Sequence, residues 1–329
     1  DMSTMSVGTN VLGYSDNFVD NEVKKIISKG TMSSLNCPEE VYLAEKMLLI
    51  HSWGDMVRFA RTGSEANCIA LRASRSFNRR DKVVICGYHG WHDWYLAANL
   101  KNKDSLNNHL YKIENLNGIT NNLKNNIFSF EYNNITQLEK IIRENKNKIS
   151  ALIMEVKRDQ NPRKDFLKKV RNLTLKNNIV LIFDECTSAF RENFGGIHLK
   201  YNIIPDLAMF GKALGNGYPI TAIVGKSKIM RELSDSFVSS TFWSDRVGPV
   251  AALATLNKME KIQSWKILDD LSSYMRKCMN QITKSEFMNF NNEGIKPNLS
   301  FSFKNRIYEK LFINLMLSSN ILSSSRCYL

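Results

Sequence analysis

The chain has 329 residues, of which 43% are hydrophobic, and its 45 Lys and Arg against 32 Asp and Glu give a formal net charge of +13. This apolar fraction is too high for a disordered chain, and the length allows about two domains. Uninterrupted apolar runs fall far short of the roughly 20 residues of a membrane helix, which excludes a bilayer-spanning protein.

The basic residues are spread along the chain and interleaved with Asn, Asp or Glu. This indicates a solvated surface and not a nucleic-acid face. The first residues, 1–4, have neither the basic nor the apolar part of a secretion signal. The six cysteines form no C-x-x-C pair, which argues against a zinc site or a disulfide framework. We therefore expect a cytoplasmic protein with no metal, nucleic-acid or membrane partner.

Short apolar runs rich in Val, Ile and Phe predict seven strands. They are Met56–Ala60, Lys82–Cys86, Ile127–Phe130, Ala151–Glu155, Ile179–Phe183, Leu207–Phe210 and Ile220–Val224. Several lack polar alternation, which is typical of strands buried on both faces of a parallel sheet. Amphipathic stretches at Ser64–Phe77, Thr136–Asn145 and Phe166–Asn177 predict helices between them. This alternation predicts an α/β doubly wound fold.

From about residue 246 the pattern changes. It predicts helices at Val250–Ile262 and Ile267–Ile282, a strand at Asn298–Phe303 and a further helix at Ile307–Leu317. We therefore expect a partial N-terminal segment over 1–35, a large domain over 36–245 and a small α+β C-terminal domain over 246–329.

The first predicted strand runs through Thr62-Gly63-Ser64 into a helix. The free N–H groups and the dipole of a helix start can hold a phosphate. Ser64 is equally suited to be a simple N-cap, so the motif leaves both interpretations open.

Aromatic residues and histidines follow the second strand in the run Tyr88-His89-Gly90-Trp91-His92. Ligands of open α/β sheets bind at the carboxyl ends of strands, and a flat ligand could stack on Tyr88. His89 and His92 could bind a metal, but no carboxylate–histidine set completes such a site. The alternative is an aromatic loop that packs on its neighbours.

An acid and a lysine follow two later strands. Asp184, at the end of one apolar run, could hold a metal, a ribose or a protonated ring nitrogen. Lys212 lies between a strand and a Gly-rich turn, where a desolvated amine can form a Schiff base, although an exposed loop lysine is the alternative. A phosphate cradle, a stacking aromatic, an acid and a lysine, in this order, are the groups that a pyridoxal phosphate (PLP) site needs.

Further motifs continue this order. They are Gly63-Ser64-Glu65-Ala66, Tyr88-His89-Gly90, Phe183-Asp184-Glu185, Phe190-Arg191, Gly211-Lys212-Ala213-Leu214-Gly215 and Ser240-Thr241-Phe242. In them the chain resembles the class III aminotransferases, and within these the glutamate-1-semialdehyde 2,1-aminomutase-like branch. The resemblance implies PLP-dependent transferase fold type I: a mostly parallel seven-stranded sheet with helices on both faces, plus a small α+β C-terminal domain.

The resemblance also implies roles for single residues. Lys212 forms the Schiff base with the cofactor and shuttles a proton, Asp184 pairs with the ring nitrogen, and Tyr88 stacks on the ring. Cys186 covers the other ring face, and Thr241 reaches the phosphate in the neighbouring subunit of a homodimer. The complete set of expected cofactor-binding residues is Gly63, Ser64, Tyr88, His89, Glu155, Asp184, Cys186, Lys212 and Thr241.

The chain departs from the family pattern after the fourth strand. Glu155-Val156 replaces the common Glu-Pro pair. The Gly-Asn that usually follows, which contacts the cofactor's 3-hydroxyl, is absent here, and Asp159-Gln160 lies nearby. Ser188-Ala189-Phe190-Arg191 replaces Thr-Gly-Phe-Arg. These features resemble a subgroup associated with surface-sugar biosynthesis. Compared with the family, we expect the chain to lack the N-terminal segment and the end of the C-terminal domain.

Three functions stay open: an aminotransferase with a small-molecule amino donor and carbonyl acceptor, an intramolecular aminomutase, and a PLP-binding homologue without activity. A nicotinamide-dependent enzyme is disfavoured because no G-x-G-x-x-G follows the first strand. Arg58, Arg61, Arg158 and Arg191 lie near candidate site segments, where they could attract anionic substrates.

Overall fold

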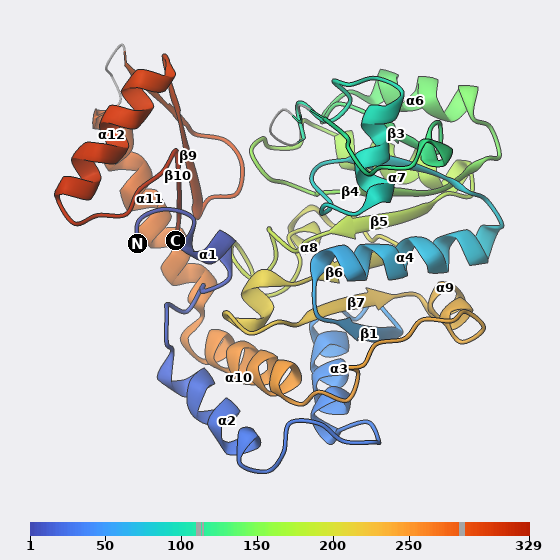
Figure 1. The fold of residues 1–329 in the computed structure, drawn as a ribbon, viewed down its shortest axis with the longest axis horizontal. Coiled ribbons are helices and arrows are strands. Elements are labelled where there is room, and N and C mark those ends of the chain that lie inside the picture. Colours follow the sequence, from blue (N-terminus) through green and yellow to red (C-terminus); the bar gives the residue numbers. More distant parts are fainter. Residues whose placement is uncertain (110–112, 114, 283–286) are drawn as a thin grey trace.

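The structure, a computed structural model, describes residues 1–109, 113, 115–282 and 287–329. Within these residues a seven-stranded sheet forms the centre of the molecule, in the order β1-β7-β6-β5-β4-β2-β3 (Figure 1). Its strands are β1 (Met56–Ala60), β2 (Lys82–Cys86), β3 (Ile127–Ser129), β4 (Ile149–Met154), β5 (Val180–Asp184), β6 (Leu207–Phe210) and β7 (Thr221–Gly225). All seven predicted strands form, and β1, β2 and β6 have the predicted bounds.

Strand β7 runs against both of its neighbours, β1 and β6, while the other pairings in the sheet are parallel. Only residues 211–220 separate β6 from β7. A parallel neighbour needs a crossover of about a dozen residues or more, so this short connection favours an antiparallel return. The sheet is therefore mostly parallel, as expected.

Helices cover both faces of this sheet. The helices are α1 (Met5–Gly8), α2 (Asn17–Ile27), α3 (Pro38–Ile50), α4 (Gly63–Asn78), α5 (Asp93–Leu96), α6 (Ile135–Glu144), α7 (Phe166–Lys176), α8 (His198–Tyr201), α9 (Ser227–Met230), α10 (Val247–Ile262), α11 (Ser264–Ile282) and α12 (Arg306–Ser318), with 3₁₀ turns η1 (Ala97–Leu100), η2 (Asn121–Leu123), η3 (Lys212–Gly215) and η4 (Arg231–Leu233). None within the described ranges is long and apolar enough to cross a membrane.

Alternate residues of the strands pack in two separate hydrophobic cores. Val84 packs in one core, together with residues of α3, α6, α7 and α10, and Val83 packs in the other with residues of α4 and α9. Successive side chains of a strand point to opposite faces. Burial on both faces explains why these strands read as continuous apolar runs.

The C-terminal part forms a second sheet, β10-β9-β8, from β8 (Met288–Asn291), β9 (Asn298–Phe303) and β10 (Arg326–Tyr328). It lies with α11 and α12 beside the main sheet, and the two chain ends lie close together (Figure 1). Tyr328 donates its N–H to the carbonyl of Ser3 at 2.8 Å, so residues from both ends of the chain meet here.

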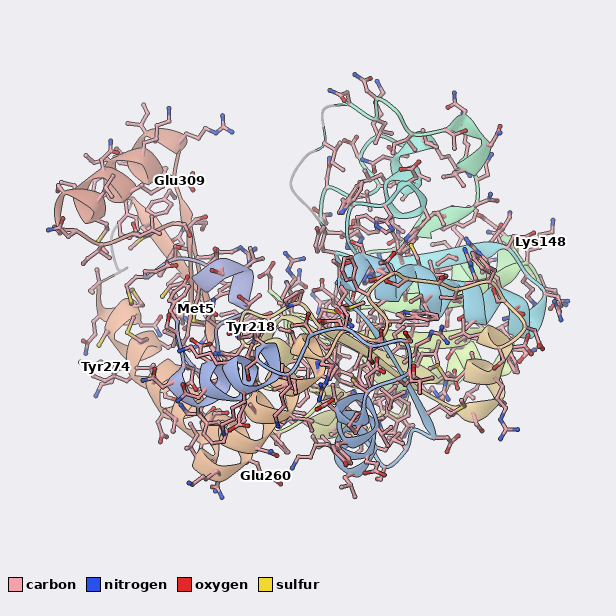
Figure 2. All side chains as sticks on the ribbon, turned by 60° about the horizontal axis from the view of Figure 1, so that its bottom comes forward. Met5, Lys148, Tyr218, Glu260, Tyr274 and Glu309 are labelled. Carbon is pink, nitrogen blue, oxygen red and sulfur yellow. The ribbon has the colours of Figure 1, made fainter. Side chains whose placement is uncertain are left out.

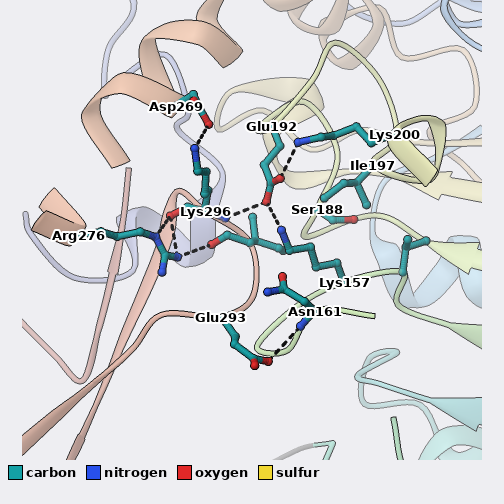
Figure 3. A network of polar contacts seen from close by, with 12 residues as sticks. Lys157, Asn161, Ser188, Glu192, Ile197, Lys200, Asp269, Arg276, Glu293 and Lys296 are labelled. Atoms are coloured by element: carbon teal, nitrogen blue, oxygen red, sulfur yellow. Dashed lines mark hydrogen bonds and ion pairs between the residues drawn. The ribbon is translucent and has the colours of Figure 1, made fainter. Parts of the chain in front are cut away.

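A network of charged residues joins the two parts (Figure 3). Glu192 accepts from Lys157 at 2.8 Å, from Lys200 at 3.0 Å and from the N–H of Lys296 at 2.8 Å. Nearby, Arg326 of β10 forms a two-pronged ion pair with Asp159, at 2.8 and 3.0 Å. The loop after β4 is thereby fastened to the C-terminal sheet.

Asp206, just before β6, is a buried carboxylate on which we expect stability to depend. It accepts from Arg171 at 2.7 and 3.0 Å, from Lys226 at 3.1 Å and from the N–H of Leu181 at 3.0 Å. Burial opposes ionisation, but these partners outweigh it and hold the pKa of Asp206 below its ordinary value. Asp206→Asn is therefore expected to lower the free energy of unfolding by about 3 kcal/mol at pH 7, measured by urea denaturation.

The pH dependence of stability tests the same role of Asp206. Because the folded-state pKa of Asp206 is depressed, its stabilisation is complete above the unfolded-state pKa of about 4 and is lost as the pH falls through the folded-state pKa. The native protein should therefore lose more stability between pH 6 and pH 3 than Asp206→Asn does. Equal losses would contradict the assignment.

Candidate active site

The carboxyl ends of β2, β4, β5 and β6 bring four of the predicted site segments to one edge of the sheet. Tyr88 donates its N–H to Oε2 of Glu155 at 3.0 Å, which joins the loop after β2 to the end of β4. His89 contacts Asp184 at the end of β5, and Lys212 begins η3 directly after β6. Parallel strands thus gather residues that are far apart in the sequence.

Asp184 is held by three hydrogen bonds. Its Oδ2 contacts Nδ1 of His89 at 2.9 Å and Nδ2 of Asn67 at 3.1 Å, and its Oδ1 accepts from the N–H of Cys186 at 3.1 Å. Burial opposes ionisation, yet these contacts outweigh it and keep the pKa of Asp184 below its ordinary value of 3.8. The carboxylate is therefore ionised at neutral pH and fixed in place.

Lys212 presents a desolvated amine. Its Nζ lies 2.8 Å from Oγ1 of Thr187, in the loop that follows Asp184. Burial lowers the pKa of Lys212, and the nearby charges of Arg158 and Arg191 lower it further, while Glu155 opposes the shift. The backbone of Lys212 has a φ of +45°, in the left-handed region that L-residues other than Asn and Asp seldom adopt. The neutral, nucleophilic form of the amine is thus easier to reach than in an exposed lysine.

The start of α4 has the form of an anion site. Thr62 is the N-cap, with Oγ1 accepting from the N–H of Glu65 at 3.2 Å, so the simple N-cap interpretation of Ser64 is wrong. No acceptor for the N–H groups of Gly63 and Ser64 lies among the described residues. Unpaired N–H groups at the positive end of a 16-residue helix can bind a phosphate.

Tyr88 and Cys186 lie at this same edge. The ring of Tyr88 packs edge-on against Tyr95, with centroids 6.0 Å apart, and the guanidinium of Arg158 lies 5.7 Å from its centroid. The sulfur of Cys186 faces Gly63 and Gly211, where an added Cβ would lie 3.4 and 3.3 Å from it. Burial raises the pKa of the Cys186 thiol well above its ordinary value, so it is an uncharged wall of the site.

Other predicted residues are not brought to Lys212. Thr241 is exposed, and no hydrogen bond links it to the site within the described part of the chain. His92 pairs with the thiol of Cys68 at 2.9 Å, whereas His89 pairs with Asp184, so the two histidines do not share a metal. Arg58 stacks on Trp243 at 4.0 Å, and Arg61 bonds the carbonyls of residues 242 and 245. Of the four arginines, Arg158 and Arg191 are those that act on Lys212.

The sequence analysis missed Thr187 and Asn67. Thr187 holds the amine of Lys212, and Asn67 bridges Asp184 and the carbonyl of His89 at 3.1 and 3.0 Å. Their positions in the sequence could have indicated them, since Thr187 lies three residues after Asp184 and Asn67 lies one turn into α4. Polar residues in apolar contexts are the feature that could have found them.

Comparison with known proteins identifies the family. The family model described as "Aminotransferase class-III" matches residues 2–292. The chain belongs to the class III aminotransferases. Among its relatives, a 3-aminobutyryl-CoA aminotransferase of Cloacimonas acidaminovorans is 33% identical over 288 residues, which are 84% of this chain and 64% of the relative. A glutamate-1-semialdehyde 2,1-aminomutase of Methanococcoides burtonii is 31% identical over 300 residues, 88% of this chain and 70% of the relative.

Solved structures show the same fold. The FumI protein of Sphingopyxis sp. MTA144, in its PLP internal aldimine form, matches with a TM-score of 0.86 at 19% identity, covering 99% of this chain and 77% of that one. An omega-transaminase from Sphaerobacter thermophilus matches with a TM-score of 0.84 at 20% identity, covering 99% and 81%. This class III aminotransferase therefore has the fold type I architecture of PLP-dependent transferases.

Pyridoxal phosphate, the cofactor of this family, fits the residues present. The helix start at Gly63 and Ser64 offers unpaired N–H donors for an anion, Asp184 is an ionised acceptor for a protonated ring nitrogen, and Lys212 is a desolvated amine. These are the three groups that a PLP site requires, and one edge of the sheet presents all of them.

Proposed function

We propose that the chain is a PLP-dependent aminotransferase that moves an amino group from a small-molecule donor to an aldehyde or keto acceptor in a ping-pong cycle. One observation carries the proposal: a buried, ionised acid, Asp184, and a desolvated amine, Lys212, lie at the ends of the adjacent strands β5 and β6. Family membership supports it. Substrate identity lies outside this proposal.

Each residue then has a definite task. When bound, PLP supplies an electron sink for the substrate carbon. Asp184 would hold a proton at the ring nitrogen, and the amine of Lys212 would carry a proton between the substrate carbon and C4′ of the cofactor. Gly63 and Ser64 donate N–H groups to the phosphate. Tyr88 and Cys186 enclose the two ring faces, and Glu155 fixes the backbone of Tyr88.

Reaction with a donor alone tests the proposal. An aminotransferase takes up the amino group in the first half of its cycle, so L-glutamate, L-alanine or β-alanine, added singly, should shift the visible absorption to the near ultraviolet. A keto acid should then restore the visible band. If PLP binds but no amine donor of a broad panel shifts the band, the inactive-homologue interpretation replaces this one.

An intramolecular aminomutase is the second candidate, because relatives such as that of M. burtonii carry this name. The same residues would serve, but the amino group would return to the same molecule. A mutase converts one amino-aldehyde acid without an added partner, whereas a transferase needs a donor and an acceptor. Product formation from the single substrate separates the two.

We further propose a cytoplasmic homodimer in which Thr241 contacts the partner's cofactor. Thr241 lies on an exposed segment beside Phe242 and near Phe237, whose side chains are 57% and 88% exposed in the single chain. Exposed apolar side chains of this kind are expected where a partner subunit packs on the surface. All six cysteines are free thiols, which suits a reducing compartment. The separate C-terminal sheet supports the division near residue 246.

Mixing two inactive variants tests the dimer. A Lys212→Ala chain and a Thr241→Ala chain, unfolded and refolded together, should regain activity, because half of the sites in mixed dimers combine an intact Lys212 with the partner's intact Thr241. Sedimentation equilibrium should give twice the chain mass. A monomer, or a mixture without recovered activity, contradicts the proposal.

A further inference from the structure

Glu185, the residue after Asp184, is a fully buried carboxylate that accepts hydrogen bonds at both oxygens. Its Oε2 accepts from Oγ of Ser188 and from the N–H of Ile197, each at 2.7 Å. Its Oε1 accepts from the N–H of His198 at 2.9 Å and contacts Nδ1 of the same residue at 2.6 Å. Burial opposes ionisation, but these contacts outweigh it and hold the pKa of Glu185 below its ordinary value of 4.5. The carboxylate therefore joins the two ends of the loop between β5 and α8.

This loop carries the residue that contacts the reactive amine. Oγ1 of Thr187 accepts from Nζ of Lys212 at 2.8 Å. The carbonyl of Thr187 accepts from Nε of the buried Arg191 at 2.8 Å, so its backbone is held as well. The next residue, Ser188, is fixed on the carboxylate of Glu185. The position of the Thr187 hydroxyl, and with it that of the amine, therefore depends on this carboxylate.

Buried rings connect the same loop to the strand that ends before Lys212. The ring of His198 lies 5.9 Å from that of His51, which in turn stacks on Phe210 at 4.3 Å. Phe210 is the last residue of β6, two residues before Lys212. Nε2 of His51 accepts from the N–H of Gly196 at 3.0 Å, and burial lowers the pKa of His51 to about 4, so the ring stays neutral and keeps this acceptor at pH 7. The loop and the amine thus rest on one packed framework.

We propose that Glu185 is a positioning residue, which holds Thr187 where its hydroxyl fixes the free amine of Lys212 for proton transfer. Proton transfer needs atoms within hydrogen-bond reach, and a displacement of about 1 Å costs up to roughly 10²-fold in rate. Glu185 itself acts only through Thr187. The proposal rests on the proposed function, because that function uses the amine of Lys212 to move a proton.

The hydrogen bonds of Glu185 make Glu185→Gln an informative change. A carboxylate accepts at both oxygens, whereas an amide accepts at its oxygen and donates at its nitrogen. Each oxygen of Glu185 faces a backbone N–H, that of Ile197 or that of His198. In either orientation the amide nitrogen of Glu185→Gln therefore meets a donor that it cannot accept. The variant releases one side of the loop while the size of the side chain is preserved.

A double-mutant cycle tests whether Glu185 acts through Thr187. The holoenzyme reacts in single turnovers with whichever of L-glutamate, L-alanine and β-alanine gives the fastest spectral shift. Glu185→Gln and Thr187→Val should each slow this reaction roughly 10- to 100-fold, and the double variant should be no slower than the slower single variant. The isotope effect of a donor deuterated at the carbon that carries the amino group should rise in each variant. Effects that multiply in the double variant, or a Glu185→Gln protein as fast as the native one, overturn the proposal.

The reactivity of the amine gives a second readout that needs neither cofactor nor turnover. Acetic anhydride labels a lysine only in its neutral form, so the pH dependence of labelling in the cofactor-free full chain reports the charge of Lys212. The exposed Lys148, which Figure 2 shows at the edge of the molecule, is the internal standard. A hydroxyl accepts more strongly from a charged amine than from a neutral one, so its loss or displacement favours the neutral form. Labelling of Lys212 should therefore shift to lower pH in Glu185→Gln and in Thr187→Val alike, and a native curve for folded Glu185→Gln contradicts the proposal.

Two serine variants separate positioning from a general loss of stability. Ser188→Ala removes one donor to Glu185 and keeps the buried charge, so it should give the same shifts to a smaller degree. Ser74→Ala removes a buried hydroxyl that donates to the carbonyl of Ala70 at 2.8 Å, in α4, and should change neither rate nor labelling.

Two further outcomes are decided in advance. If Glu185→Gln does not fold, native rates and labelling in Ser188→Ala overturn the proposal. If no amine donor reacts with the native holoenzyme, the proposed function fails, while the labelling curves of Lys212 still test the role of Glu185. The two failures are thus distinguishable.

Discussion

Lys212→Ala is expected to abolish the visible absorption of the PLP-loaded protein and to lower transamination by at least about 10³-fold. The native band should bleach on reduction with borohydride, and the variant should show no band to bleach. The reason is the position of the amine: Nζ of Lys212 is desolvated and held by Thr187 at 2.8 Å, one strand away from Asp184. Spectra, borohydride reduction and single-turnover rates measure the effect.

The control for this loss is Lys228→Ala. Lys228 is an exposed lysine of α9, the helix that packs on α4 and β1. Its removal should leave the spectrum and the rate unchanged. If Lys212→Ala has the same visible absorption band as the native protein, the assignment of Lys212 as the reactive lysine is wrong.

Asp184→Asn is expected to lower the rate roughly 10²- to 10⁴-fold while PLP still binds. An amide carries no charge and cannot hold a proton at a ring nitrogen. His89 and Asn67 both donate to the native carboxylate, so the change also leaves buried donors with a poorer acceptor. The visible band should shift, because its position reports the protonation of the ring. Stopped-flow rates and titrated spectra measure both effects.

Asp206→Asn is a matched control for Asp184→Asn. Both residues are buried carboxylates of neighbouring strands, but Asp206 precedes β6 at the opposite edge of the sheet. Asp206→Asn should lose stability without a change of the spectrum, and Asp184→Asn should change the spectrum. Identical spectra of Asp184→Asn and the native holoenzyme would remove Asp184 from the ring nitrogen.

The pH dependence of the native spectrum gives a further check on Asp184. Its hydrogen bonds keep the pKa below 3.8, so the carboxylate stays ionised above about pH 4. A titration of the visible band near neutral pH therefore reports another group. The low pKa explains how a buried acid can hold a proton on its ligand without taking that proton itself.

Local sequence patterns were enough to predict the sheet strands, because a strand buried on both faces must be apolar throughout. β2 and β6, which are buried almost throughout, have the predicted bounds. β1 also has its predicted bounds, although it is an edge strand and only Ala60 in it is fully buried. It was harder to predict which of two neighbouring polar residues caps a helix. Thr62 and Ser64 are both good N-caps, and only the path of the chain into α4 decided for Thr62.

The sequence by itself determined the strand–helix alternation and the presence of an acid and a lysine after two strands, since both depend on residue type and spacing along the chain. Only the tertiary structure decided which groups meet. Strand order and register bring His89 to Asp184, and the N-terminal turn places the Gly8 carbonyl on Arg191, which is fully buried. Contacts between residues that are far apart in the sequence produce no local pattern of residue types, because only folding brings these residues together.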